Sequence, residues 1–161
     1  MMMDYPGYGK SRGERSESKI YQWATWVYQL ARKKYEPKQI ILYGKSLGTG
    51  VASYLASKKD CNQLILETPY SNFPAVFSHY MPIYPFESLL HYQFPTEQYL
   101  QQVDVPIRIV HGTSDFVISH QQAIQLTKRK KGIELLLIED GSHNNLFNFQ
   151  QARITLRQWL L

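Results

Sequence analysis

The sequence predicts an α/β fold in which a mostly parallel sheet is covered by helices on both faces. Four short runs are almost continuously apolar, as is typical of strands buried on both faces; they lie at residues 40–43, 64–67, 107–110 and 134–138. Segments with helical spacing of apolar residues separate these runs, and such alternation is typical of α/β proteins. Because the chain has 161 residues, we expect a single domain over residues 1–161.

Four helices are expected around these strands. The first precedes residue 40 and has Ser16 or Ser18 as its N-cap, and the second ends at residues 58–59. A third begins near Ser119, a candidate N-cap, and stops at Gly132, and a fourth occupies the C-terminus. The expected apolar face of the first helix consists of Ile20, Trp23, Val27, Leu30 and Ala31.

Residues 70–102 interrupt the alternation of strands and helices. This insert is rich in proline and aromatic residues, contains no lysine or arginine, and is too long and apolar for an ordinary loop. Two interpretations remain open: a small lid over the site, or a satellite cluster of apolar side chains.

Composition excludes several classes of protein. The net charge of +5 suits binding to nucleic acid or to an anionic surface, but the densest basic run, residues 128–131, ends a predicted helix and has no interleaved aromatics. We therefore expect no nucleic-acid partner.

Cys61 is the only cysteine, so no intrachain disulfide, metal site or other cofactor is expected. No run reaches the ~18 apolar residues of a membrane span and no signal peptide is visible, which predicts a cytoplasmic chain without a membrane anchor.

A glycine-flanked serine follows the first predicted strand. Residues 44–48 read Gly-Lys-Ser-Leu-Gly and lead into a helix, and a G-x-S-x-G in that position is typical of a nucleophile elbow. The turn is so tight that only small residues fit two positions to either side of the serine, and its strain lifts the hydroxyl clear of the sheet. We predict that Ser46 is the nucleophile and that the backbone N–H of Leu47, at the helix N-terminus, stabilises an oxyanion.

A serine nucleophile needs a base, and the base needs an acid that orients it. Asp115 lies just past the third predicted strand and His143 just past the fourth, so Ser46, Asp115 and His143 meet at one edge of the sheet and follow the order of the α/β-hydrolase fold. The structural alternatives are a turn serine, a helix-capping aspartate and a surface histidine. Competing candidates are less well placed: Asp104, Asp140, His79, His91, His111 and His120, of which His111 is interpreted as pocket wall or as a structural residue.

Five motifs carry a resemblance to a known family: DYPGYGKSRG (4–13), ILYGKSLGTG (41–50), LILETPYS (64–71), VPIRIVHGTSD (105–115) and GSHNNL (141–146). Together they resemble the serine aminopeptidase-like branch of the α/β-hydrolases. That branch includes bacterial hydrolases and eukaryotic α/β-hydrolase-domain proteins, some of which remove palmitate from cysteines. The resemblance implies the roles already predicted: Ser46 as nucleophile, Asp115 as acid, His143 as base and the backbone N–H of Leu47 as an oxyanion donor.

The resemblance also implies a longer parent protein. Family members carry upstream strands and an H-G-G or H-G-N turn that supplies a second oxyanion N–H, and often a membrane anchor. Only three residues precede Asp4 here, so we expect a fold without its N-terminal part, in which residues 40–43 form an edge strand.

The predicted function is hydrolysis of an ester, thioester or amide bond through an acyl-enzyme intermediate. The substrate would be a small molecule or an acyl or peptidyl compound, and the aromatic insert without lysine or arginine favours an apolar acyl group or a small aryl ester. The alternatives are a catalytically impaired fragment that acts as an interaction module, and a protein that binds nucleic acid or an anionic surface.

Overall fold

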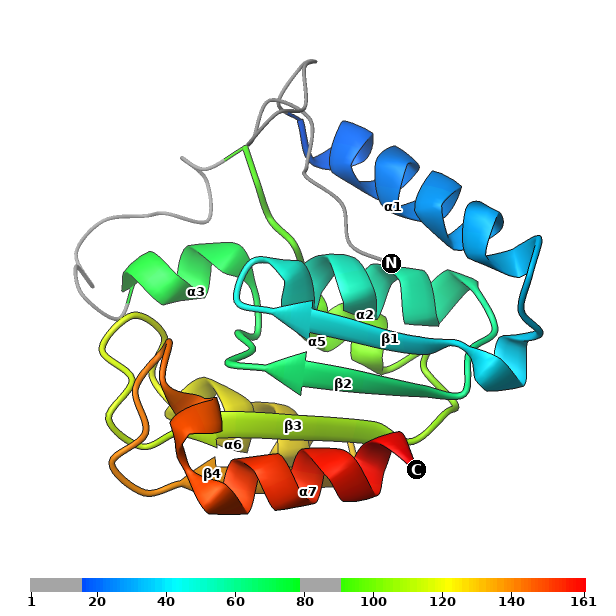
Figure 1. Ribbon diagram of the computed structural model, residues 1–161. Helices are drawn as coiled ribbons and strands as arrows, with labels where there is room; N and C mark the ends of the chain where they lie inside the picture. Colours follow the sequence, from blue (N-terminus) through cyan, green and yellow to red (C-terminus); the bar gives the residue numbers. More distant parts are fainter. Residues whose placement is uncertain (1–15, 79–90) are drawn as a thin grey trace.

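Residues 16–78 and 91–161 are described by the computed structural model, and they form a parallel sheet between two layers of helices (Figure 1). In this part of the chain the sheet has four strands in the order β1-β2-β3-β4, which is also their order in the sequence. The strands are β1 (Ile41–Lys45), β2 (Gln63–Glu67), β3 (Ile107–Gly112) and β4 (Ile133–Ile138). The predicted fold class and all four predicted strands are confirmed.

The two faces of the sheet carry separate hydrophobic cores. Side chains of a strand alternate between faces, so Leu64 and Leu66 point to one core and Ile65 points to the other. The first core is closed by α1 (Glu17–Arg32), α2 (Gly48–Lys58), α5 (Thr96–Leu100) and α6 (Gln121–Arg129). The second is closed by α7 (Gln150–Leu160), which crosses the near face of the sheet in Figure 1.

The first helix differs from its prediction in the face that it buries. Ser16 is its N-cap, as expected, and accepts a hydrogen bond from the backbone N–H of Lys19 at 3.3 Å. The buried residues are Ile20, Ala24 and Tyr28, whereas Trp23 is 38% exposed. The reason is that α1 packs against α2, where Tyr21 stacks on Tyr54 of that helix with ring centroids 4.0 Å apart, and small Ala24 permits close approach.

The N-cap of α6 lies one residue later in the sequence than expected. Ser119 was the candidate N-cap, but His120 occupies that position in helical conformation and makes no side-chain cap bond. Ser119 Oγ instead accepts from the N–H of Gln121 at 3.4 Å. The expected cap is therefore wrong by one residue, while the helix itself and its basic end are confirmed.

The insert is described only at its two ends, because residues 79–90 lie outside the described residues. Its first end forms α3 (Phe73–Ser78), and its second end carries the fully buried Phe94 and Leu100 into the first core. The carboxylate of Glu17 holds this second end by accepting from the backbone N–H of Gln93 at 2.6 Å and of Phe94 at 3.1 Å. The ends are thus part of the core, and the lid stays a prediction.

Within the described residues, β1 is hydrogen-bonded to β2 alone and so forms an edge of the sheet. Tyr43 in this strand is 44% exposed, whereas every residue of the central strand β2 is buried. An edge position was expected for this strand. No helix among residues 16–78 and 91–161 has the length and apolarity needed to cross a membrane.

Candidate active site

Ser46 occupies a strained turn between β1 and α2. Its φ angle is 50°, in the left-handed region that residues with a side chain rarely adopt. The turn needs glycine because a Cβ on Gly44 would lie 2.4 Å from the carbonyl oxygen of Gly48. The backbone N–H of Ser46 donates to the carbonyl of Glu67 at 2.9 Å, which ties the turn to the end of β2. This geometry is that of the predicted nucleophile elbow.

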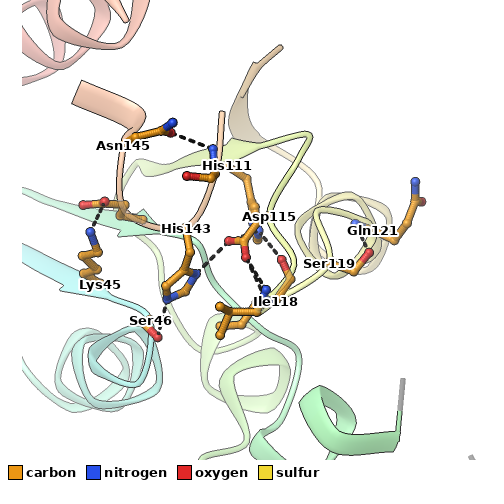
Figure 2. A network of polar contacts seen from close by, with 12 residues as sticks. Lys45, Ser46, His111, Asp115, Ile118, Ser119, Gln121, His143 and Asn145 are labelled. Carbon is orange, nitrogen blue, oxygen red and sulfur yellow. Dashed lines mark hydrogen bonds and ion pairs between the residues drawn. The ribbon is translucent and has the colours of Figure 1, made fainter. Parts of the chain in front are cut away.

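The three predicted site residues lie in hydrogen-bond contact (Figure 2). Ser46 Oγ is 3.0 Å from His143 Nε2, and His143 Nδ1 is 2.8 Å from Asp115 Oδ2. A neutral imidazole with its proton on Nδ1 satisfies both contacts, because it donates to the carboxylate and accepts from the hydroxyl. The structure therefore brings Ser46, His143 and Asp115 together from the carboxyl ends of β1, β4 and β3.

Two glycines let the loops of Asp115 and His143 touch. A Cβ on Gly112 would lie 2.1 Å from the carbonyl oxygen of Gly141, so the backbones approach as closely as only glycine permits. The same carbonyl accepts from the N–H of Ser114 at 2.9 Å. Asp140, a rejected competitor for the acid, has a φ of 56° and its N–H donates to Thr113 Oγ1, so it shapes this turn as expected.

Asp115 is fixed by four donors. Its Oδ1 accepts from the backbone N–H groups of Val117 at 2.8 Å and Ile118 at 2.9 Å, and its Oδ2 lies near two histidines. Burial alone would raise the pKa of this carboxyl, but the hydrogen bonds from His111, Ile118, His143 and Val117 outweigh it and lower the pKa to about 2. The carboxylate thus stays ionised beside His143.

Leu47, the predicted oxyanion donor, directly follows Ser46 and is the N-cap residue of α2. Leu47 directly precedes α2, so its N–H lies at the N-terminal end of the helix dipole. Its carbonyl accepts from the hydroxyl of the fully buried Tyr70 at 3.1 Å, which anchors the residue. Sequence reasoning did not find Tyr70, because a tyrosine in an aromatic insert carries no signal for a backbone contact.

A buried charged cluster beside the elbow was also missed. Glu67 ends β2 almost fully buried, pairs with Lys45 Nζ at 2.9 Å and accepts from the hydroxyl of Tyr43. Burial and the contact with Glu67 raise the pKa of Tyr43. The available signal was a carboxylate at the end of an otherwise apolar strand.

The other competitors do not reach the triad. Asp104 and His91 are exposed, and His120 contacts Gln121 at the start of α6. His79 lies outside the described residues. Among the residues that the structure describes, no three His, Cys, Asp or Glu side chains are grouped to hold a metal ion.

Comparison with known proteins agrees with this arrangement. The family described as "Alpha/beta hydrolase domain" matches residues 3–155. Alpha/beta hydrolase domain-containing protein 17C is 32% identical over 161 residues in both Mus musculus and Homo sapiens, covering 98% of this chain and 49% and 47% of the relatives. The chain therefore spans about half the length of the curated relatives it matches.

Solved structures show the same fold. Est1E from Butyrivibrio proteoclasticus, with ferulic acid bound, gives a TM-score of 0.76 at 17% identity, covering 96% of this chain and 74% of that one. The Pyrococcus furiosus esterase Pf2001 gives 0.74 at 19% identity, covering 98% and 68%. Since the sequence, the elbow and the sheet all agree with the family match, the chain belongs to the α/β-hydrolase family.

Proposed function

We propose that this chain carries the catalytic core of a serine hydrolase that cleaves an ester, thioester or amide bond through an acyl-enzyme intermediate. One observation carries the proposal: the continuous hydrogen-bonded series Ser46–His143–Asp115, with contacts of 3.0 and 2.8 Å. The strained φ of Ser46 supports it, because such strain concentrates where a reactive group is held in place.

The mechanism follows from these contacts. Ser46 Oγ attacks the carbonyl carbon while its proton passes to His143 Nε2, and Asp115 holds the imidazole in the right tautomer and stabilises the resulting cation. The tetrahedral intermediate collapses when His143 returns the proton to the leaving group, which leaves the acyl group on Ser46. Water, deprotonated by His143, then attacks the acyl carbon, and His143 returns the proton to Ser46 Oγ as the bond to the serine breaks and the acid is released.

The oxyanion of the intermediate would accept from the backbone N–H of Leu47. Sites of this kind use a second N–H from a preceding loop, and loss of one donor costs roughly 10²–10³ in rate. We therefore expect slow turnover where Leu47 acts alone. Modification of Ser46 by a reactive phosphorus probe depends less on that donor and is the more sensitive test.

Apolar surface around the site favours an apolar acyl or aryl group. Phe116, 85% exposed, and Val117 directly follow Asp115, and Phe73 packs near the buried Tyr70 at the start of the insert. No lysine or arginine lies in residues 70–102 that would pair with an anionic substrate. The ferulic acid bound by Est1E, a structural neighbour, is an aromatic acid in keeping with this preference.

A fluorophosphonate probe tests the proposal. The purified chain is expected to gain one phosphonyl group, and peptide mapping should place it on Ser46. Ser46→Ala should abolish labelling, whereas Ser57→Ala, a control on α2 whose hydroxyl only donates to the carbonyl of Tyr54 at 2.8 Å, should leave it intact. Folded protein without labelling would favour the alternative, an impaired hydrolase-like module.

A further inference from the structure

His111 is an imidazole enclosed in the protein interior. It lies near the end of β3, one residue before Gly112, and its side chain is 0% exposed. A polar group in such a place needs hydrogen-bond partners, because burial removes the water that would otherwise serve it. The partners therefore reveal what the ring does.

One ring nitrogen of His111 contacts two acceptors. His111 Nε2 lies 2.9 Å from the carbonyl oxygen of Ile118 and 3.3 Å from Asp115 Oδ2 (Figure 2). Neither a carbonyl nor an ionised carboxylate can donate, so the proton must sit on Nε2. His111 is thus a donor shared between the Ile118 carbonyl and Asp115.

The other ring nitrogen of His111, Nδ1, makes no comparable contact among the described residues. His111 Nδ1 is buried and has no hydrogen-bond partner among the described residues. A histidine retained for packing alone would be better replaced by a phenylalanine of similar shape, which buries no unpaired nitrogen. The polar contact of Nε2 therefore accounts for a histidine at this position better than packing does.

We infer that His111 is a positioning residue of the triad, which shares the charge of Asp115 and thereby sets how strongly Asp115 supports His143. The inference rests on the proposed function of the triad. His111 Nε2 and His143 Nδ1 approach the same oxygen, Oδ2, while Oδ1 is occupied by the N–H groups of Val117 and Ile118. The N–H of His111 Nε2 faces the same carboxylate oxygen that His143 contacts, so it takes up part of the negative charge that would otherwise act on the imidazole of His143.

Other ionisable groups around this pair are few. Glu67 and Lys45 stand at the ends of β2 and β1 and pair with each other, and His120 at the start of α6 contacts Gln121. No described residue of α2 or α3 is charged apart from Lys58 at the far end of α2. Exposed Glu139 and Asp140 precede His143 in its loop. All of these groups are the same in wild type and in the His111 variants, so a difference in labelling between them is attributable to the contact with Asp115.

Two substitutions at His111 distinguish the effect of its N–H donor from the effect of the shape of its ring. His111→Phe keeps the shape and removes the donor, whereas His111→Gln places an amide N–H near the position of Nε2. The measurement is the rate of fluorophosphonate labelling from pH 5 to pH 9, and the readout is the midpoint of the acid limb of that profile, where the rate falls as the pH is lowered. His111→Phe should move that limb up by about 0.5–1 pH unit, and His111→Gln should return it to within about 0.2 unit of wild type.

Three results would overturn the inference. The first is a folded His111→Phe protein whose acid limb of labelling lies at the same pH as in wild type. The second is a shift of this limb in His111→Phe that is equally present in His111→Gln. The third is independent of the variants: ¹⁵N NMR of the wild-type ring should show the proton on Nε2, and a proton on Nδ1 alone would exclude donation to Asp115. If the wild type is never labelled, the proposed function fails, and NMR titration of His143 in wild type and His111→Phe still decides the inference.

Discussion

Gly112→Ala should disable the site by separating the two loops that carry Asp115 and His143. The added Cβ would lie 2.1 Å from the carbonyl oxygen of Gly141 and 2.4 Å from its carbon, whereas ordinary contact begins at 3.4 Å. The loops must therefore move apart by about 1 Å. The Asp115–His143 contact of 2.8 Å would then lengthen past the limit of a hydrogen bond.

The expected magnitude follows from that displacement. A misplacement of about 1 Å in a catalytic group costs roughly 100-fold in rate, and overpacking a close contact costs about 1–3 kcal/mol of stability. The assay is the rate of fluorophosphonate labelling at pH 7.5, normalised to the folded fraction by circular dichroism. Thermal unfolding of the same samples separates loss of geometry from loss of fold.

Gly132→Ala is the matched control. Gly132 lies in the turn before β4 with a φ of 85° and nothing within 4 Å of an added Cβ, so alanine there meets backbone strain of about 1–2 kcal/mol but no clash. Its stability should fall while labelling stays at the wild-type rate. A folded Gly112→Ala protein that is labelled within threefold of wild type would refute the reasoning.

The remaining predictions concern the insert and acid stability. Glu17→Ala should destabilise the fold by about 2–4 kcal/mol in urea unfolding, because the N–H groups of Gln93 and Phe94 lose their acceptor. Glu97→Ala, which removes the 3.6 Å ion pair with the exposed Arg129, should change stability by less than about 1 kcal/mol. Since folding lowers the pKa of Asp115 from 3.8 to about 2, this carboxylate stabilises the fold above pH 4, and about 2 kcal/mol should be lost as the pH falls to about 2. Asp115→Asn should remove that part of the pH dependence, and an equally steep loss in the variant would contradict the assignment.

Local pattern was sufficient to predict the strands and the elbow. Strands buried on both faces are apolar at most positions, so β2 and β3 were visible as runs, and the position of Ser46 after such a run predicted the turn. Asp115 and His143 followed because parallel strands bring their carboxyl ends to one edge.

Features that depend on neighbours could not be predicted in this way. The buried face of α1 is set by α2 and its Tyr54, and periodicity alone did not separate Ala24 from Trp23. His111 was interpreted as pocket wall or structure, and its contact with Asp115 was not predicted because it depends on how the loop after β3 folds back. The close approach of Gly112 to Gly141 could not be predicted either, because it brings together the ends of two different strands.

The strand order β1-β2-β3-β4 has a consequence for how the chain folds. Because each strand pairs with its neighbour in the sequence, the sheet can grow by adding one strand at a time, and the longest connection to be closed on the way is the one between β2 and β3, which contains the insert. The hydrogen bond between Ser46 and His143 joins residues 97 apart in the sequence, and it forms only when β1 and β4 are both in register. Recovery of labelling after dilution from urea should therefore lag behind the recovery of helical and tryptophan signals, and its half-time would report the last step of sheet assembly.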